Sequence, residues 1–161
     1  MSNPVFETIR TTRSVRFFKE APLPDEVIHL ILEAGRRSGS AKNTQPWHFV
    51  VIRNRETLTA LSVLGDGAGH LARAAMAVAL VTEVPYTRDS VPFDLGRAAQ
   101  NMMVAARSEG VGSVMATLYQ TDRAAEALKL PAGLTVPWCI SFGYPAEEPG
   151  GPPRKGGRRS F

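Results

Sequence analysis

The hydrophobic positions along this chain change from one spacing to another, and each spacing predicts a different kind of element. Apolar residues three and four apart predict an amphipathic helix that begins near Val27 and ends at Gly35 or Gly39. Its apolar positions are Val27, Leu30, Ile31 and Ala34. Short apolar and β-branched runs typical of core strands are His48–Ile52, Ala75–Thr82, Val111–Leu118 and Val136–Gly143. The pattern therefore predicts one central sheet of about four strands.

Helical spacing returns between these runs. Further helices are predicted at Val5–Thr11, Glu56–Leu64 and Asp122–Leu128. A longer helix is predicted from an N-cap at Asp94 to Glu109. Apolar residues cover most of its circumference, which places it in the middle of the protein or in an obligate dimer interface. Because helices do not alternate strictly with strands, we expect an α+β fold rather than a doubly wound parallel sheet.

Composition narrows the class of protein. The length of 161 residues suits a single domain over 1–161, in which residues 145–161, rich in Pro, Gly and Arg, form an extended C-terminal segment. No apolar run reaches the roughly 20 residues of a membrane span, and Met1–Pro4 lacks the start of a signal peptide. The lone Cys139 is expected to be a small buried residue, and an unpaired cysteine points to the cytoplasm.

The net charge of +4 is unevenly distributed, with basic residues gathered near both ends of the chain. Such clusters fit nucleic acid, a solvated surface or a site for a single phosphate. Nucleic acid has the least support, because no zinc-ligand spacing, helix-turn-helix pattern or stacking-aromatic motif accompanies the charge.

The first basic cluster is a candidate phosphate site. Arg13 and Arg16 flank Ser14 in a segment predicted to be extended or turning. A guanidinium fork matches phosphate oxygens and stays charged at any working pH. Taken alone, however, the cluster is better explained by surface arginines paired with Glu20 or Glu33.

The second basic cluster, Arg154 and Lys155, is ambiguous in the same way. By itself it fits a basic tail. It joins a functional site only if the tail folds back to meet the first cluster.

The loop Ser40–Trp47 is more specific. Asn43 and Gln45 each offer a donor and an acceptor, as an imide-like ring edge does, and in an extended loop they would point the same way. Pro46 stiffens the backbone and Trp47 can anchor the loop. A plain helix-to-strand connection needs no such set of amides. With two basic ends and this loop, the chain suits a planar polar ring that carries a phosphate, such as flavin mononucleotide (FMN).

The order of these motifs resembles that of the nitroreductase family of flavoenzymes. The similar segments are Arg13-Ser14-Val15-Arg16-x-Phe18, Ser40-x-x-Asn43-x-Gln45-Pro46-Trp47, Asp94-Leu95-Gly96-x-Ala98-x-Gln100-Asn101, Gly110-Val111-Gly112-Ser113, and Gly143-Tyr144-Pro145 followed by Arg154-Lys155. The resemblance covers nearly the whole chain. It implies an FMN-binding α+β homodimer with a central mixed sheet flanked by helices and a cofactor in each of two clefts at the subunit interface. The long helix from Asp94 would then form the dimer core.

The resemblance also implies cofactor contacts. The residues that would meet the phosphate, the ribityl chain and the pyrimidine edge are Arg13, Ser14, Arg16, Arg154 and Lys155. Those that would approach the flavin ring, partly from the partner subunit, are Ser40, Asn43 and Gln45. The strand residues near the ring would be Met115, Ala116 and Thr117.

The implied activity is a two-step transfer of hydride from NAD(P)H to flavin N5 and on to a nitroaromatic, a quinone or a second flavin. No side chain is needed as a proton-transfer catalyst, and Arg16 would stabilise the reduced flavin electrostatically. Two alternatives stay open within the fold: a different flavin reaction, such as dehalogenation or flavin fragmentation, and a non-catalytic FMN carrier or sensor. A small basic module that binds nucleic acid is a third.

The chain departs from the family pattern at three places. Thr12 stands where many members have a first arginine, which shifts the predicted phosphate affinity toward the C-terminal cations. Lys42 occupies a loop position often filled by a small residue. The segment between Thr82 and Phe93 is too short for the inserted lid of larger members, so we expect an open cleft.

Overall fold

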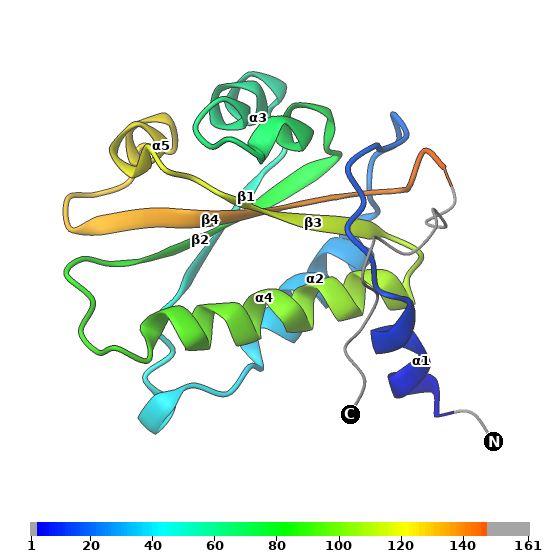
Figure 1. Ribbon diagram of the computed structural model, residues 1–161, viewed down its shortest axis with the longest axis horizontal. Helices are drawn as coiled ribbons and strands as arrows, with labels where there is room; N and C mark the ends of the chain where they lie inside the picture. Colours follow the sequence, from blue (N-terminus) through cyan, green and yellow to red (C-terminus); the bar gives the residue numbers. More distant parts are fainter. Residues whose placement is uncertain (1–2, 148–161) are drawn as a thin grey trace.

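The computed structural model describes residues 3–147, and in this part of the chain an antiparallel sheet separates two groups of helices (Figure 1). The strands in spatial order are β1 (His48–Ile52), β2 (Met76–Glu83), β4 (Leu134–Gly143) and β3 (Gly112–Thr117). One face is covered by α2 (Asp25–Arg36) and α4 (Val91–Ser108). The other is covered by α3 (Arg55–Ser62), α5 (Thr121–Ala127) and the 3₁₀ helix η2 (Ala68–Arg73). Helix α1 (Pro4–Thr11) lies beside the C-terminal end of α4.

The predicted α+β class is confirmed, with one qualification about the sheet. All three strand pairs are antiparallel. Within residues 3–147, the parallel component of the expected mixed sheet is a single bridge between Ser14 and Ser113, at the outer edge of β3. The predictions for Arg154, Lys155 and the segment from 148 onward lie outside the described residues.

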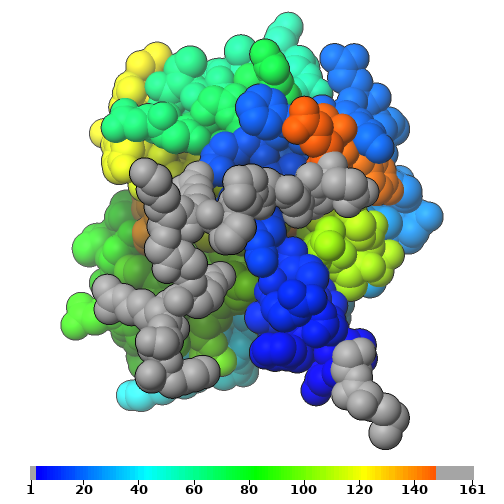
Figure 2. All heavy atoms as spheres, turned by 45° about the vertical axis from the view of Figure 1, so that its right-hand side comes forward, coloured from blue at the N-terminus to red at the C-terminus, as the bar shows by residue number. Residues whose placement is uncertain are grey.

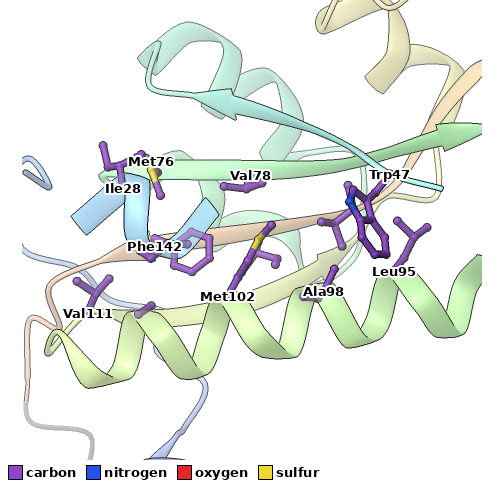
Figure 3. Packing of buried hydrophobic residues seen from close by; sticks show 14 of the residues in the cluster. Ile28, Trp47, Met76, Val78, Leu95, Ala98, Met102, Val111 and Phe142 are labelled. Atoms are coloured by element: carbon purple, nitrogen blue, oxygen red, sulfur yellow. The ribbon is translucent and has the colours of Figure 1, made fainter. Parts of the chain in front are cut away.

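Alternation along β2 sends side chains into two hydrophobic cores. Met76, Val78 and Leu80 face α2 and α4, whereas Ala77, Ala79 and Val81 face α3 and η2. Figure 3 shows the first core, in which Trp47 lies over Leu95 and Ala98 of α4, and Met102 points toward Phe142 of β4. The loop residue Trp47 is therefore part of the core, as the sequence predicted.

The helix predicted near Val27 is present, but its buried stripe differs from the prediction. The stripe consists of Ile28, Ile31 and Gly35, while Leu30 is 41% exposed. Gly35, one of the two glycines expected to end the helix, lies inside it, and Met102 of α4 occupies the space that a Cβ at Gly35 would need. The helix ends at Arg36.

The start of the long helix was also predicted wrongly. α4 begins at Val91 after Ser90, with Pro92 in the first turn, where proline is well tolerated. Asp94 is therefore inside the helix and buried. The helix packs one side against the sheet, while Gly96 and Gln100 lie on its exposed side.

The other predicted helices and strands match the observed bounds to within two residues. Cys139 is fully buried, as expected. No helix among residues 3–147 combines the length and the apolar character needed to cross a membrane.

Candidate functional site

The basic turn runs along the outer edge of β3. Val15 donates its backbone N–H to the Ser113 carbonyl at 3.0 Å, and its side chain packs with Phe18, Ala74 and Val114. This packing leaves Ser14 and Arg16 exposed. In Figure 2 the blue residues of this turn lie between the green region of η2 and the orange end of β4. The predicted extended segment is confirmed, and β3 is what holds it in place.

The two arginines of the turn differ in their surroundings. Arg13 Nη1 donates to the Arg10 carbonyl at 2.6 Å and to the Thr12 carbonyl at 2.9 Å, at the end of α1. Cations are favoured there because the last carbonyls of a helix have no intrahelical partner. Arg16 has no hydrogen bond or ion pair with any residue between 3 and 147. Its guanidinium group is therefore available to an anion, whereas that of Arg13 has to turn away from α1.

The simpler explanation of these arginines, pairing with a nearby glutamate, has no support from the geometry. Glu33 binds Arg36 and Arg37, each at 2.6 Å. These hydrogen bonds lower the pKa of Glu33 to about 2. Neither Arg13 nor Arg16 forms an ion pair with a described carboxylate.

A small hollow lies beside the turn, between the ends of α1 and α4 and the start of β3. Its lining includes Thr12, Arg13 and Arg107. Arg107, in the last turn of α4, approaches Thr11 with Nε 3.4 Å from the hydroxyl oxygen. A third cation, which the sequence pattern did not single out, therefore lies near the position where Thr12 replaces the family arginine.

The amide loop is not extended, so the condition under which Asn43 and Gln45 would point the same way is not met. Residues Ala41–Asn43 form a short 3₁₀ turn, η1. Lys42, Asn43 and Gln45 have φ values of 52°, 55° and 48°. A left-handed conformation is uncommon for residues other than glycine, and asparagine tolerates it best. Asn43 and Gln45 therefore do not alternate as strand neighbours would, although both are exposed.

Hydrogen bonds within the loop and hydrogen bonds to side chains of α4 hold the loop in this shape. Ser40 Oγ accepts the N–H of Gln45 at 2.9 Å, which closes the loop. Asp94 Oδ2 accepts the N–H of Ala41 at 2.9 Å. Asn101 Nδ2 donates to Ser38 Oγ at 2.7 Å. Ser40 is a candidate cofactor contact, and its hydroxyl also stabilises the loop.

Two further contacts fix the loop ends. The guanidinium of Arg97 lies against Gly39, in the space that a Cβ would need, and Nη1 is 3.7 Å from Asp94 Oδ1. At the other end Trp47 is buried and its ring stacks with Phe49, with ring centroids 6.0 Å apart. The loop is therefore a preformed structure whose exposed rim carries the amide side chains.

The predicted strand residues divide between the two faces of β3. Met115 and Thr117 are exposed. Ala116 is only 2% exposed and belongs to the core beneath α3 and α5. The side chain of Ala116 is thus directed away from the candidate site, and only its backbone can take part. This division follows from strand geometry, in which neighbouring side chains face opposite sides.

The two halves of the predicted site lie at opposite ends of α4. The amide loop is attached at Asp94, and the basic turn is near Arg107. Thirteen residues separate these positions (107 − 94), which corresponds to about 20 Å of helix at 1.5 Å per residue. A single described chain therefore does not bring the amide loop and the basic turn together.

One buried polar pair, formed by His70 and Ser141, was not identified from the sequence. His70 Nδ1 lies 2.7 Å from Ser141 Oγ, and His70 is 7% exposed. Burial and the charge of Arg16 lower the pKa of His70 to about 4, while the Met115 backbone acts in the opposite direction. Nothing in the sequence pattern links two residues 71 positions apart. Elsewhere, burial raises the pKa of the Cys139 thiol to about 12, so it is inert.

Among residues 3–147, no three His, Cys, Asp or Glu side chains gather as a metal site would require. This part of the chain carries cations and hydroxyls near the C-terminal end of α4 and exposed amides near its N-terminal end.

Residues 9–84 and 67–144 match the Nitroreductase family. The chain therefore belongs to this family. It is also similar to a protein of Archaeoglobus fulgidus that is provisionally named NADH dehydrogenase/NAD(P)H nitroreductase. That relative is 34% identical over 147 residues, which cover 87% of this chain and 84% of the relative.

Solved structures agree with this assignment. A provisionally named nitroreductase of Desulfovibrio desulfuricans in complex with FMN is 30% identical, with a TM-score of 0.82, and the match covers 96% of this chain and 93% of that one. An FMN-dependent nitroreductase of Clostridium difficile is 26% identical, with a TM-score of 0.83, and the match covers 89% of this chain and 88% of that one. The family, the fold and the expected cofactor class thus agree with the interpretation of the sequence.

Proposed function

We propose that this chain is an FMN-dependent oxidoreductase that works as a homodimer and transfers hydride from NAD(P)H to a small aromatic acceptor. The observation that carries the proposal is the separation of the amide loop and the basic turn by the length of α4. A two-fold axis that sets two copies of α4 antiparallel brings the loop of one chain to the turn of the other. Each of the two resulting clefts then holds both halves of one site.

The surface of α1 supports such a dimer. Val5, Phe6 and Ile9 are 64%, 59% and 51% exposed, and no residue of α1 is buried. A contiguous apolar face of this kind on a helix is typical of a contact surface. The exposed side of α4, with Gly96 and Gln100, lets a second helix approach closely. Ala98 and Ala99 belong to the core of the chain itself.

The residues present fit FMN. Arg16 is an exposed cation without a described carboxylate partner, and Arg13 and Ser14 lie beside it. On the proposed role, Arg13 and Ser14 bind the phosphate end, and Arg16 stabilises negative charge at the pyrimidine edge. Asn43 and Gln45 of the partner chain hydrogen-bond the ring, and the edge at Met115 supports it. Arg154 and Lys155 complete the phosphate site in this proposal.

Bound FMN would supply hydride transfer between NAD(P)H and a nitroaromatic, a quinone or a second flavin, and Arg13, Ser14 and Arg16 of one chain with Asn43 and Gln45 of the partner chain would hold it. The protein supplies orientation, exclusion of water and a positive environment. The cationic groups of the turn favour a ring that carries negative charge after reduction. No described side chain is required to move a proton.

The test is a visible absorption spectrum of the purified dimer loaded with FMN. Anaerobic NADPH or NADH should bleach the flavin, and an added nitroaromatic or quinone should restore the colour within the mixing time. Reduction without return would support a carrier or sensor in place of an oxidoreductase. A protein that binds no FMN at all would overturn the proposal. Light scattering of the same sample checks the dimer.

A further inference from the structure

Arg107 is a cation whose hydrogen-bond donors are mostly unused in the part of the chain that the structure describes. It is half-buried in the last turn of α4, and its side-chain hydrogen bond is the 3.4 Å contact from Nε to the Thr11 hydroxyl. Within residues 3–147, its Nη groups have no hydrogen-bond partner and it forms no ion pair. The Nη donors therefore remain available to a further acceptor.

The small hollow beside the basic turn holds this group next to a second cation. Its lining includes two arginines and three hydroxyl-bearing residues, namely Arg13, Arg107, Thr11, Thr12 and Ser113. No acidic residue lines it, and neither arginine forms an ion pair with a described carboxylate. Two cations around one hollow repel each other unless an anion lies between them. The hollow therefore favours a negatively charged group.

The register of the basic turn along β3 places the hollow at one end of the candidate cofactor site. Ser14 pairs with Ser113 in a parallel bridge, and Ser113 lines the hollow. Because the two segments run in the same direction, the turn continues toward Arg16 as β3 continues toward Met115. In the proposed site, Arg13 and Ser14 bind the phosphate end of FMN, whereas Arg16 and Met115 meet the ring. The hollow therefore lies at the phosphate end.

We propose that Arg107 is a cofactor-binding residue, which binds the FMN phosphate together with Arg13 and replaces the arginine that many family members have at the position of Thr12. The inference rests on the proposed function. Thr12 has no charge to offer, and its hydroxyl donates to the Thr8 carbonyl at 2.7 Å. Arg107 reaches the same hollow from α4. Its planar guanidinium group matches the oxygens of a phosphate dianion.

The alternative is a purely structural arginine. Cations are favoured in the last turn of a helix, where the final carbonyl groups have no intrahelical partner. In that case the loss of Arg107 would lower stability, and flavins with and without a phosphate would be affected alike. A phosphate contact instead predicts an effect on FMN that is absent for riboflavin, which has the same ring and ribityl chain but no phosphate.

The experiment measures the dissociation constants of FMN and riboflavin by fluorescence titration for wild type, Arg107→Gln and Arg36→Gln. Arg36 is the matched control, because it is also an arginine in the last turn of a helix. Glutamine keeps a donor for Thr11 and removes the charge. Urea unfolding shows whether each variant keeps its stability. In parallel, ¹H–¹⁵N spectra of the arginine Nε–H groups of wild type are recorded without flavin and with each flavin.

We expect Arg107→Gln to weaken FMN binding about tenfold, the effect of one lost charge-assisted hydrogen bond, and to leave riboflavin binding unchanged. Arg36→Gln should match wild type with both flavins. Adding Thr12→Arg to Arg107→Gln should restore most of the FMN affinity, because it returns a guanidinium group to the hollow. In wild type, FMN should shift the Arg107 Nε resonance more than riboflavin does.

An equal loss of FMN and riboflavin affinity in Arg107→Gln, or no loss of either, would overturn the assignment. A double variant that binds FMN no better than Arg107→Gln would also contradict it. If Arg107→Gln does not fold, the wild-type spectra decide the question, since an Arg107 resonance that responds equally to both flavins excludes a phosphate contact. Wild type that binds neither flavin refutes the proposed function itself. Wild type that binds FMN without a response of Arg107 to the phosphate refutes this inference alone.

Discussion

Asp94 Oδ2 accepts the backbone N–H of Ala41 at 2.9 Å, and the two residues are 53 positions apart in the sequence. The carboxylate is 2% exposed and lies in the first turn of α4, where the helix dipole favours a negative charge. Arg97 lies 3.7 Å from its other oxygen. Asp94 thus ties the amide loop to α4, which packs against the sheet.

This link leads to the first prediction, on Asp94→Ala. Removing the carboxylate leaves the Ala41 N–H without its partner and should lower the free energy of unfolding by about 1–3 kcal/mol. The loop, with three residues of positive φ, should then sample other conformations, so FMN affinity should fall as well. Urea unfolding and fluorescence titration with FMN measure the two effects.

Two control variants make this result specific. Asp94→Asn keeps an oxygen acceptor for Ala41 and should lose less affinity than Asp94→Ala. Asp89→Ala removes an exposed carboxylate near the start of α4 and should behave as wild type. Equal FMN affinity in wild type and Asp94→Ala would mean that α4 does not position the loop.

The sequence predicted the elements well because hydrophobic spacing reports directly on helix and strand geometry. It failed on Asp94 because an acidic residue before an apolar run fits both an N-cap and a buried first-turn position. Pro92 was the signal that could have decided between them, since proline favours the first helical turn. Likewise, Gly35 looks like a terminator in sequence, and only the position of Met102 shows that it is a packing residue.

Candidate site residues that lie within one short motif could be named from the sequence. Contacts between segments that are distant in the sequence could not. The exposed amides of Asn43 and Gln45 could be named from the loop sequence, but not their left-handed backbone. The pairing of His70 with Ser141 depends on the contact between η2 and β4, which no local pattern encodes. Ala116 was included with its neighbours although strand alternation directs its side chain into the core.

A second prediction concerns the close approach of the basic turn to β3. A Cβ at Gly112 would lie 2.7 Å from Val15 Cβ, a branched side chain held in a packed cluster. Gly112→Ala should therefore push the turn away from β3, lower stability by about 1–3 kcal/mol and weaken FMN binding. Thermal unfolding and FMN titration measure both.

The matched control for that variant is Gly67→Ala. Its Cβ would meet no atom within 4 Å, and its φ of −107° suits alanine. Gly67→Ala should be neutral or slightly stabilising. If the two alanine variants prove equally stable, the contact between Val15 and Gly112 does not constrain the turn.

A third prediction tests the proposed dimer through α1. Phe6→Glu places a charge on an exposed apolar face without disturbing a buried residue. We expect a folded monomer that has lost most of its FMN, because each cleft needs both chains. Val63→Glu, at an equally exposed apolar position near the end of α3 on the far side of the sheet, should remain dimeric. Light scattering and flavin content, measured together, check this; a Phe6→Glu monomer with full flavin content would contradict the shared site.

The last prediction is the pH dependence that His70 confers on the cofactor-free protein. Burial and Arg16 lower its pKa in the folded chain from 6.5 to about 4. Between these values the unfolded chain binds a proton that the folded chain does not, so the free energy of unfolding should fall as the pH drops from 6.5 toward 4. His70→Gln has no proton to bind there, so its stability should fall less steeply over the same range. Urea unfolding at several pH values gives the two curves. Parallel curves for wild type and His70→Gln would show that the imidazole is as easily protonated in the folded chain as in the unfolded one.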